Sequence, residues 1–242
     1  MKLSRVSADT RIRARIRDVR RVPDLDPGAA VLKVGRRVDV EEHNTRRPRL
    51  RSWDEVMKLA EALDGSVKTA YLLSARAGLR PAEAVALTWG DVDLEGRQIR
   101  VWKQILSIDE GPIRSDVPRT VPIPEVLARH LAAVKPVPRA DNALVCPPPR
   151  RKKKNGTRGA YRGTYLGEKS IRAALARAFK ATGIPPADFY DYGRHTFASL
   201  AALGGAPAWR LREVLGHADI ERTLEYVSLR DLPPAGAVPA SI

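Results

Sequence analysis

The sequence predicts an α+β domain that is mainly α-helical and contains one small antiparallel β-hairpin or sheet. Helix signals dominate. Residues 52–55 (SWDE) form a capping box ahead of a helical apolar pattern, while Gly78 and Pro81 mark the end of one helix and the first turn of the next. Apolar residues alternate over 97–106, and 119–123 (RTVPI) supplies the matching strand across a long tip.

The remaining elements follow from apolar periodicity and from glycine and proline positions. Beyond the helices that begin near Ser52 and Pro81, we expect helices over about 66–76, 124–134, 168–181, 194–203, 207–215 and 219–227. Asp219 is expected to cap the last of them. The stretch 147–159 (PPPRRKKKNGTRG) predicts a mobile loop. We place domain limits at 1–46 (basic N-terminal segment), 47–232 (main domain) and 233–242 (tail).

Composition restricts the classes of function. The 242 residues have 43% apolar content and a net charge of +15, which allows a folded core and favours a polyanionic partner, nucleic acid first. No eighteen apolar residues run together, so we expect no membrane segment and a cytoplasmic protein. Cys146 is the only cysteine and the four histidines lack an HExxH spacing, so neither a metal site nor a cofactor is expected.

Five consecutive basic residues lie at 150–154. Such a run either follows the phosphates of DNA or stays solvated, and the net charge favours phosphate contact. The residues expected to bind DNA are Arg150, Arg151, Lys152, Lys153, Lys154 and Arg158.

Three motifs occur in a fixed order along the main domain. They are GLRPAEAVALTWGDVDL (78–94), GRHTFASL (193–200) and LGHADIERTLEY (215–226). Together they resemble the tyrosine recombinase, or phage integrase, family over roughly residues 47–229. The resemblance implies the catalytic-domain fold of that family, with a double-stranded DNA substrate and a homotetramer on DNA.

The resemblance also implies the roles of individual residues. Arg80 and Arg194 match the two catalytic arginines, His217 the histidine of the Leu-Gly-His element, and Tyr226 the nucleophile. Glu83 matches the acidic residue that supports the first arginine. Guanidiniums suit this chemistry because they fork onto the oxygens of a phosphate as negative charge develops there. A phenol with a pKa near 10 needs nearby positive charge or a base to attack, and no metal is then required.

Two positions depart from the family pattern. Asp191 stands three residues before Arg194, where the family has a histidine or lysine, and a register shifted by one brings Tyr190 there instead. The family lysine that acts as general acid on the hairpin is replaced by Ile113-Arg114 or by Arg114-Ser115, depending on the register. Lys103 is the only lysine nearby, and it is either this acid or a surface lysine. His195 is interpreted as structural.

We therefore expect a site-specific recombinase domain that cleaves and rejoins DNA through a 3′-phosphotyrosyl intermediate. The alternative is an impaired integrase remnant that binds DNA or a partner integrase without cleavage, and a type IB topoisomerase relative is a third hypothesis. The family has a helical core-binding domain before the catalytic domain, and residues 1–46 resemble at most its last helix and linker. With fewer phosphate contacts, we expect weak, salt-sensitive DNA binding.

Overall fold

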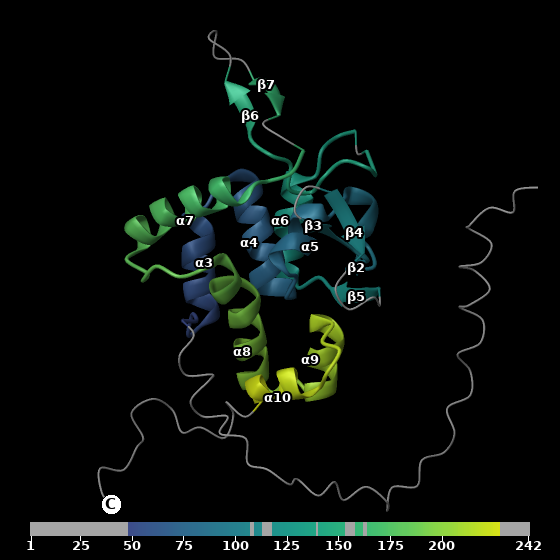
Figure 1. Cartoon of the computed structure of the whole chain (residues 1–242), viewed down its shortest axis with the longest axis vertical. Coiled ribbons are helices and arrows are strands. Elements are labelled where there is room, and N and C mark those ends of the chain that lie inside the picture. The colour runs from purple at the N-terminus through teal and green to yellow at the C-terminus, as the bar shows by residue number, and fades with distance from the viewer. Residues whose placement is uncertain are drawn as a thin grey trace, which may run out of the picture. The chain divides into compact units, whose positions relative to one another are not determined.

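The computed structural model describes residues 48–106, 109–112, 118–138, 140–152, 158–161 and 164–227, all within one compact unit, Asp39–Ile242. The elements in chain order are α3 (Trp53–Glu61), α4 (Gly65–Ala77), α5 (Pro81–Ala86), the 3-10 helix η1 (Trp89–Asp91), β1 (Val92–Asp93), β2 (Gln98–Val101), β3 (Lys103–Leu106), β4 (Asp109–Pro112), β5 (Arg119–Pro122), α6 (Glu125–Val134), β6 (Arg150–Lys152), β7 (Arg158–Tyr161), α7 (Glu168–Thr182), the π-helix η2 (Asp191–His195), α8 (Thr196–Leu203), α9 (Ala208–Leu215) and α10 (Glu221–Val227). The predicted class, mainly helical with a small antiparallel sheet, is confirmed (Figure 1).

The first helices form as their end signals predict. Ser52 Oγ accepts the Glu55 N–H at 3.2 Å at the start of α3, and the Glu55 carboxylate accepts the Arg51 N–H at 2.6 Å, one residue earlier than a capping box requires. Gly78 ends α4 with φ 72°, and Pro81 begins α5. Helix α4 is buried along nearly its whole length, so it is the central helix of the main core.

The predicted hairpin is present as an antiparallel sheet in the order β1-β2-β5, with Ile99 opposite Val121. Between β2 and β5 the chain adds a second antiparallel pair, β3 with β4. The expected long tip therefore contains a two-stranded ribbon of its own.

The prediction of a loop over 147–159 is wrong in part. Strands β6 and β7 pair there, with Arg150 opposite Tyr161 and Lys152 opposite Arg158, and they project from the helical body in Figure 1. Charge and proline content suggested a loop, but a hairpin needs only backbone hydrogen bonds on either side of a turn. The dipeptide Asn155-Gly156 is a strong hairpin signal and was available in the sequence.

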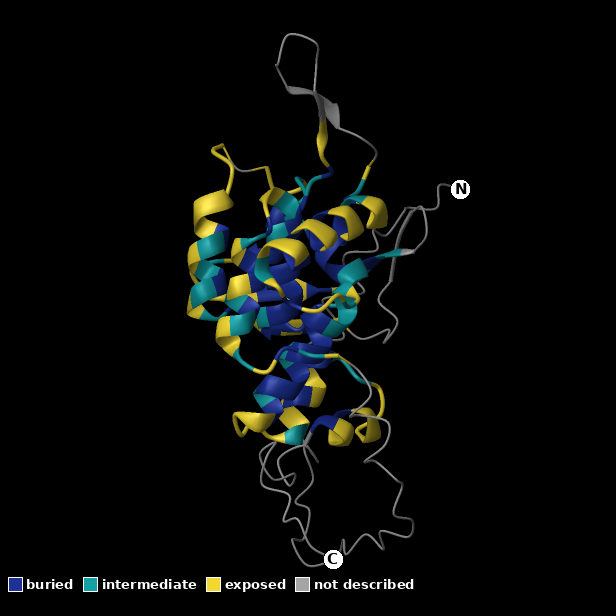
Figure 2. Cartoon of the chain, turned by 90° about the vertical axis from the view of Figure 1, so that its left-hand side faces the viewer, coloured by how far each residue is buried: buried dark blue, intermediate teal, exposed yellow. Residues whose placement is uncertain are grey.

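The described residues form two apolar clusters of unequal size. Helices α3 to α7 and the β1-β2-β5 sheet surround the main core, whereas α8, α9 and α10 enclose a small second cluster. The buried members of the second cluster are Ala198, Ala202, Leu211, Leu215 and Tyr226. Figure 2 shows exposed residues on the outer faces of these last helices.

The edges of the domain differ in part from the prediction. Helix α10 begins at Glu221, so Ile220 rather than Asp219 precedes it, because the chain bends over 218–220 before the helix starts. The segments 1–46 and 233–242 lie outside the described residues, and the boundary near residue 47 stays a prediction. No helix in the described part of the chain is long and apolar enough to cross a membrane.

Candidate active site

Arg80 lies in the tight turn between α4 and α5. This turn needs a glycine at position 78, because a Cβ there would lie 2.7 Å from the Phe197 ring in addition to the positive φ. Glu83, one turn further, binds Arg80 twice: its Oε2 accepts the Arg80 backbone N–H at 2.8 Å and its Oε1 accepts Nη1 at 2.9 Å. Glu83 therefore fixes the direction of the Arg80 side chain.

Arg119, the first residue of β5, belongs to the same cluster and was not predicted. Its Nη1 and Nη2 donate to both oxygens of Glu83 at 3.0 and 2.6 Å, and its Nε donates to the Val214 carbonyl at 2.8 Å. Burial raises the pKa of Glu83, but the hydrogen bonds and charge of Arg119 outweigh burial and, with Arg194 and the Arg80 N–H, hold this pKa below its usual value. Glu83 is thus a buried carboxylate shared by two arginines.

One sequence signal could have found Arg119. Alternate residues of a strand share one face, so Arg119 lies on the same face as Val121 and Ile123. Both of these residues are buried, so Arg119 faces inward. An arginine at an inward position needs a buried partner of opposite charge.

Arg194 reaches the same place from the π-helix η2. Its Nη1 donates to the Gly78 carbonyl at 2.8 Å and its Nη2 to the Leu215 carbonyl at 2.5 Å, while Nη2 of Arg80 donates to the next carbonyl, Gly216, at 3.3 Å. Burial and the neighbouring Arg80 lower the pKa of Arg194 to about 10, so it remains a cation at neutral pH. Two guanidiniums therefore converge on consecutive carbonyls of one turn.

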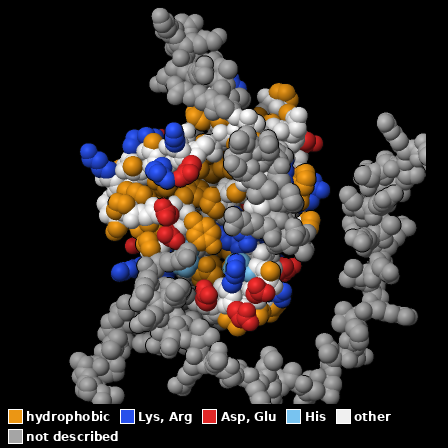
Figure 3. All heavy atoms as spheres, viewed as in Figure 1, with side chains coloured by type: hydrophobic (Ala, Val, Ile, Leu, Met, Phe, Trp, Pro, Cys, Tyr) orange, Lys and Arg blue, Asp and Glu red, His pale blue; other side chains and the backbone are white. Residues whose placement is uncertain are grey.

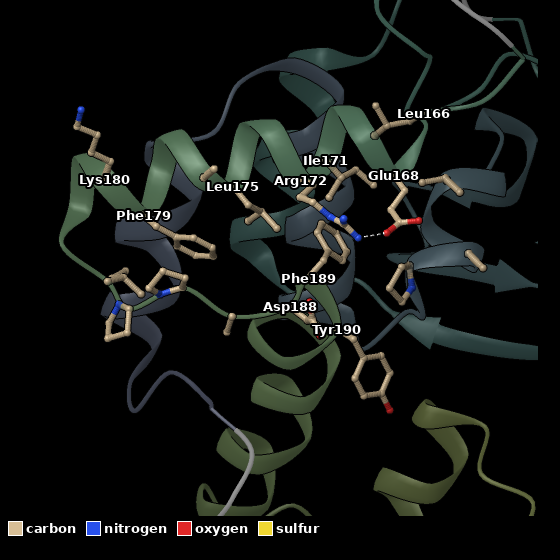
Figure 4. A pocket seen from close by; sticks show the side chains of 18 of the residues that line it. Leu166, Glu168, Ile171, Arg172, Leu175, Phe179, Lys180, Asp188, Phe189 and Tyr190 are labelled. Carbon is tan, nitrogen blue, oxygen red and sulfur yellow. Dashed lines mark hydrogen bonds and ion pairs between the residues drawn. The ribbon is translucent and has the colours of Figure 1, made fainter.

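The π-helical turn decides which residue accompanies Arg194. A π turn takes about one residue more than an α turn. The residue one turn before Arg194 is therefore Tyr190, four positions earlier, and not Asp191, three positions earlier. Tyr190 is among the groups whose charge acts on Arg194. Asp191 acts elsewhere: the pKa of Tyr192 is raised by burial and then by the carboxylates of Glu55 and Asp191. Figure 4 shows the Tyr190 ring pointing away from α7.

Tyr190 also lines a cavity, which Figure 4 shows from close by. An open, largely apolar cavity of about 1250 Å³ lies between α7 and residues 183–190, and Tyr190 is part of its wall. Phe179, Ile171 and Leu175 of α7 line it. The cavity adjoins the arginine turn through Pro81 of α5.

His217 follows the turn to which both guanidiniums bond. Gly216 ends α9 with φ 63°, which releases the chain from the helix. The His217 Nδ1 lies 2.9 Å from Thr223 Oγ1. Burial lowers the pKa of His217 to about 3, and the positive charges of Arg194 and Arg80 add to this effect. His217 is therefore neutral at pH 7.

Tyr226, on α10, lies against His217. The two rings are nearly parallel, 18° apart, with centroids 6.4 Å apart. The Tyr226 hydroxyl lies 3.0 Å from Nδ1 of His195, and both residues are buried. The structure thus gives His195, interpreted from the sequence as structural, a direct contact with the phenol.

Lys103 lies in a different cluster. Its Nζ is 3.9 Å from Asp91 Oδ2 and 5.2 Å from the centroid of the Trp102 ring, and the Trp102 Nε1 donates to the same carboxylate at 2.7 Å. Arg114, the other position considered for the general acid, lies outside the described residues.

Of the residues expected to bind DNA, four lie on the β6–β7 pair and two lie outside the described residues. Those on the strands are Arg150, Arg151, Lys152 and Arg158; those outside are Lys153 and Lys154. Within the described ranges, no three His, Cys, Asp or Glu side chains are grouped so that they could hold a metal ion.

A mainly helical domain that gathers two arginines, a histidine and a tyrosine at one turn has the features of a tyrosine recombinase catalytic domain. The chain belongs to the phage integrase family, whose model matches residues 51–232.

Relatives and solved structures agree with this assignment. The chain is 31% identical to a tyrosine recombinase XerC-like protein of Caldanaerobacter subterraneus subsp. tengcongensis, over 70% of this chain and 47% of the relative, and 28% identical to tyrosine recombinase XerD of Mycobacterium tuberculosis, over 82% and 62%. It therefore spans less than two thirds of either relative.

Two solved structures share the fold. The Tn1549 transposon integrase, in complex with a circular intermediate DNA, has a TM-score of 0.55 at 20% identity, covering 74% of this chain and 61% of that one. The XerA recombinase has a TM-score of 0.53 at 24% identity, covering 76% and 62%.

Proposed function

We propose that this chain cleaves and rejoins DNA strands through a 3′-phosphotyrosyl intermediate, as the catalytic domain of a site-specific recombinase. The observation that carries the proposal is the convergence of Arg80 and Arg194 on the Leu215–Gly216 carbonyls, beside His217 and the stacked Tyr226 ring.

The reaction balances without a metal or cofactor. The Tyr226 Oη attacks the phosphorus, a P–O bond to tyrosine forms, and the bond to the 5′-oxygen breaks. The phenol loses its proton and the leaving 5′-oxygen gains one. Arg80 and Arg194 stabilise the charge on the non-bridging oxygens. Attack by a 5′-hydroxyl on the phosphotyrosine reverses these steps and rejoins a strand.

We propose two candidates, Arg114 and Lys103, for the residue that protonates the leaving oxygen. Arg114 has the position of the family lysine, but a guanidinium does not give up its proton in proteins, which makes it a poor acid. Lys103 is a better acid, but in this structure its ammonium is paired with Asp91. Either residue acts as the acid only if it reaches the scissile bond when DNA is bound.

The site as described is closed. Tyr226 is 7% exposed and Arg194 is 1% exposed, whereas the Arg80 side chain is 19% exposed. We infer that the phosphate meets Arg80 first and that α10 then moves to release Tyr226 from His195. The phosphate charge also raises the pKa of His217 and so improves it as a proton acceptor.

We propose double-stranded DNA as the partner, bound by a homotetramer of this chain, with the β6–β7 pair contacting the backbone. Figure 3 shows acidic and basic side chains mixed at the end where Figure 1 places α9 and α10. The solved integrase complex contains DNA, which supports this assignment.

The test is covalent trapping with a pool of nicked duplexes randomised around the nick, so that rejoining is impossible and the target sequence need not be known. The wild-type chain and Tyr165→Phe, a matched tyrosine control, should form SDS-resistant complexes, and Tyr226→Phe should form none. DNA binding without any covalent complex would instead support the remnant that binds without cleaving.

A further inference from the structure

Glu83 is the centre of a buried charge network in which one carboxylate serves two arginines. It accepts hydrogen bonds from Nη1 of both Arg80 and Arg119 on Oε1, and from the Arg80 N–H and Arg119 Nη2 on Oε2. The Glu83 side chain is 0% exposed and that of Arg119 is 5% exposed. Water cannot solvate this carboxylate, so its charge must be balanced by these neighbours.

Arg119 has the stronger hold on Glu83. It binds both carboxylate oxygens through the two ends of its guanidinium, whereas Arg80 uses only Nη1 of its side chain and directs Nη2 to the Gly216 carbonyl. Two parallel bonds of this kind are the strongest arginine–carboxylate geometry. Because Arg119 takes up the charge of Glu83, most of the charge of Arg80 stays available for another anion.

Arg119 also connects the turn of Arg80 to the turn of His217. Its Nε donates to the Val214 carbonyl, in the last turn of α9. A Cβ at Gly216 would lie 3.0 Å from Arg119 Cδ and Nη1, so the glycine is in close contact with the arginine. The Arg119 side chain thus holds the turn of Arg80 and the turn of His217 at a fixed spacing.

We propose that Arg119 is a positioning residue for strand cleavage: it neutralises Glu83 so that Arg80 can bind the scissile phosphate, and it holds the Val214–His217 turn beside Arg80. This inference rests on the proposed function. Arg119 does not itself touch the phosphate, because its side chain is only 5% exposed and its guanidinium is directed at Glu83 and the Val214 carbonyl.

The first arm of the test compares rates of covalent trapping on the randomised nicked duplexes. Arg119→Gln should lower the rate about 100-fold, because a displaced catalytic group costs that much. Adding Glu83→Gln removes the uncompensated carboxylate and should recover roughly tenfold of this loss. Arg100→Gln, on neighbouring strand β2 and exposed, is the matched control and should trap DNA at the wild-type rate.

The second arm needs no DNA and measures unfolding by urea between pH 4 and pH 7. In the wild type the pKa of Glu83 is lowered, so its contribution to stability is present at neutral pH and is lost as the pH falls through the folded-state pKa. Without Arg119, burial dominates and the pKa of Glu83 rises. Acidification then protonates Glu83, which removes its unpaired buried charge and stabilises the Arg119→Gln variant. The stability gap between wild type and Arg119→Gln should therefore narrow toward pH 4, and should not change with pH in the Glu83→Gln background.

The two arms separate the possible failures. If the wild type traps no DNA but the gap narrows, the proposed function fails and the coupling of Arg119 to Glu83 stands. A double variant no faster than Arg119→Gln, or a gap that does not change with pH, overturns the charge-balancing role. If the role of Arg119 were purely structural, adding Glu83→Gln would not restore the trapping rate of Arg119→Gln.

Discussion

The two halves of the candidate site are anchored in different ways. The arginine half, Arg80, Glu83, Arg119 and Arg194, is held by buried ion pairs and carbonyl bonds beside the main core. The tyrosine half is α10, a helix of seven residues that packs Tyr226 into the small cluster of α8 and α9. The arginine half is therefore anchored beside the main core, whereas the tyrosine half, within the described residues, is anchored in the smaller cluster.

This difference suits phosphoryl transfer. Charged donors stabilise a transition state best when they are already in place, because no reorganisation is then needed during the reaction. A nucleophile that must form and release a covalent link to DNA benefits from the opposite property, a low local stability. We expect the hydroxyl contact between Tyr226 and His195 to hold the phenol in this position until DNA binds.

The largest effect is expected in the arginine half. In Arg194→Lys, an ammonium cannot reach both the Gly78 and Leu215 carbonyls and cannot fork onto a phosphate. We expect the rate of covalent trapping to fall about 100- to 1000-fold, as when one preorganised donor is removed, while circular dichroism stays native. Arg97→Lys, at an exposed ion pair with Glu125, is the control and should trap normally. If Arg194→Lys trapped DNA at the wild-type rate, a positive charge at this position would be enough and the fork geometry of arginine would not be needed.

A smaller effect is expected next to Arg194. Tyr190→Phe removes one hydroxyl on the arginine side and should slow trapping about tenfold, the value of one hydrogen bond to a charged group. Asp191→Asn should leave the rate nearly unchanged, because the charge of this partly buried carboxylate acts on Tyr192. Rates are measured with saturating duplex. If Asp191→Asn accelerates trapping strongly, the carboxylate faces the phosphate and the assignment of the register is wrong.

The same segment shows what the sequence can and cannot predict. Helices, the hairpin and the turns at Gly78 and Gly216 follow from local rules of capping, periodicity and glycine conformation, and the structure confirms them. The π turn could not be predicted from these local rules. It packs closely on α4, where a Cβ at Gly193 would lie 2.4 Å from Ser74 Oγ. Motif spacing alone therefore left open whether Tyr190 or Asp191 accompanies Arg194.

The same limit applies to the buried partners. The ordered motifs led to Arg80, Arg194, His217 and Tyr226, because each lies within a recognisable stretch of sequence. Arg119 contacts Glu83 from 36 residues away along the chain, and no local pattern shows which carboxylate a buried strand arginine will find. Pairings of this kind become visible only when the sheet and helices are packed together.

The smallest effect is expected in the tyrosine half, where one contact is tested by hydrogen exchange. His195→Phe removes the partner of the Tyr226 hydroxyl and should cost about 1 kcal/mol of local stability. Amide protection should fall in α10 and stay unchanged in α4, since Tyr226 of α10 belongs to the small cluster and α4 is the centre of the main core.

Tyr226→Phe is the matched variant, because it removes the other partner of the same bond. The two substitutions combined should cost less than the sum of the single ones, since the bond is already lost in each. An additive double variant would mean that the hydroxyl and the imidazole do not interact. Equal loss of protection in α4 and α10 would show that the tyrosine helix opens only with the whole domain, and the nucleophile would then be as rigidly placed as the arginines that face it.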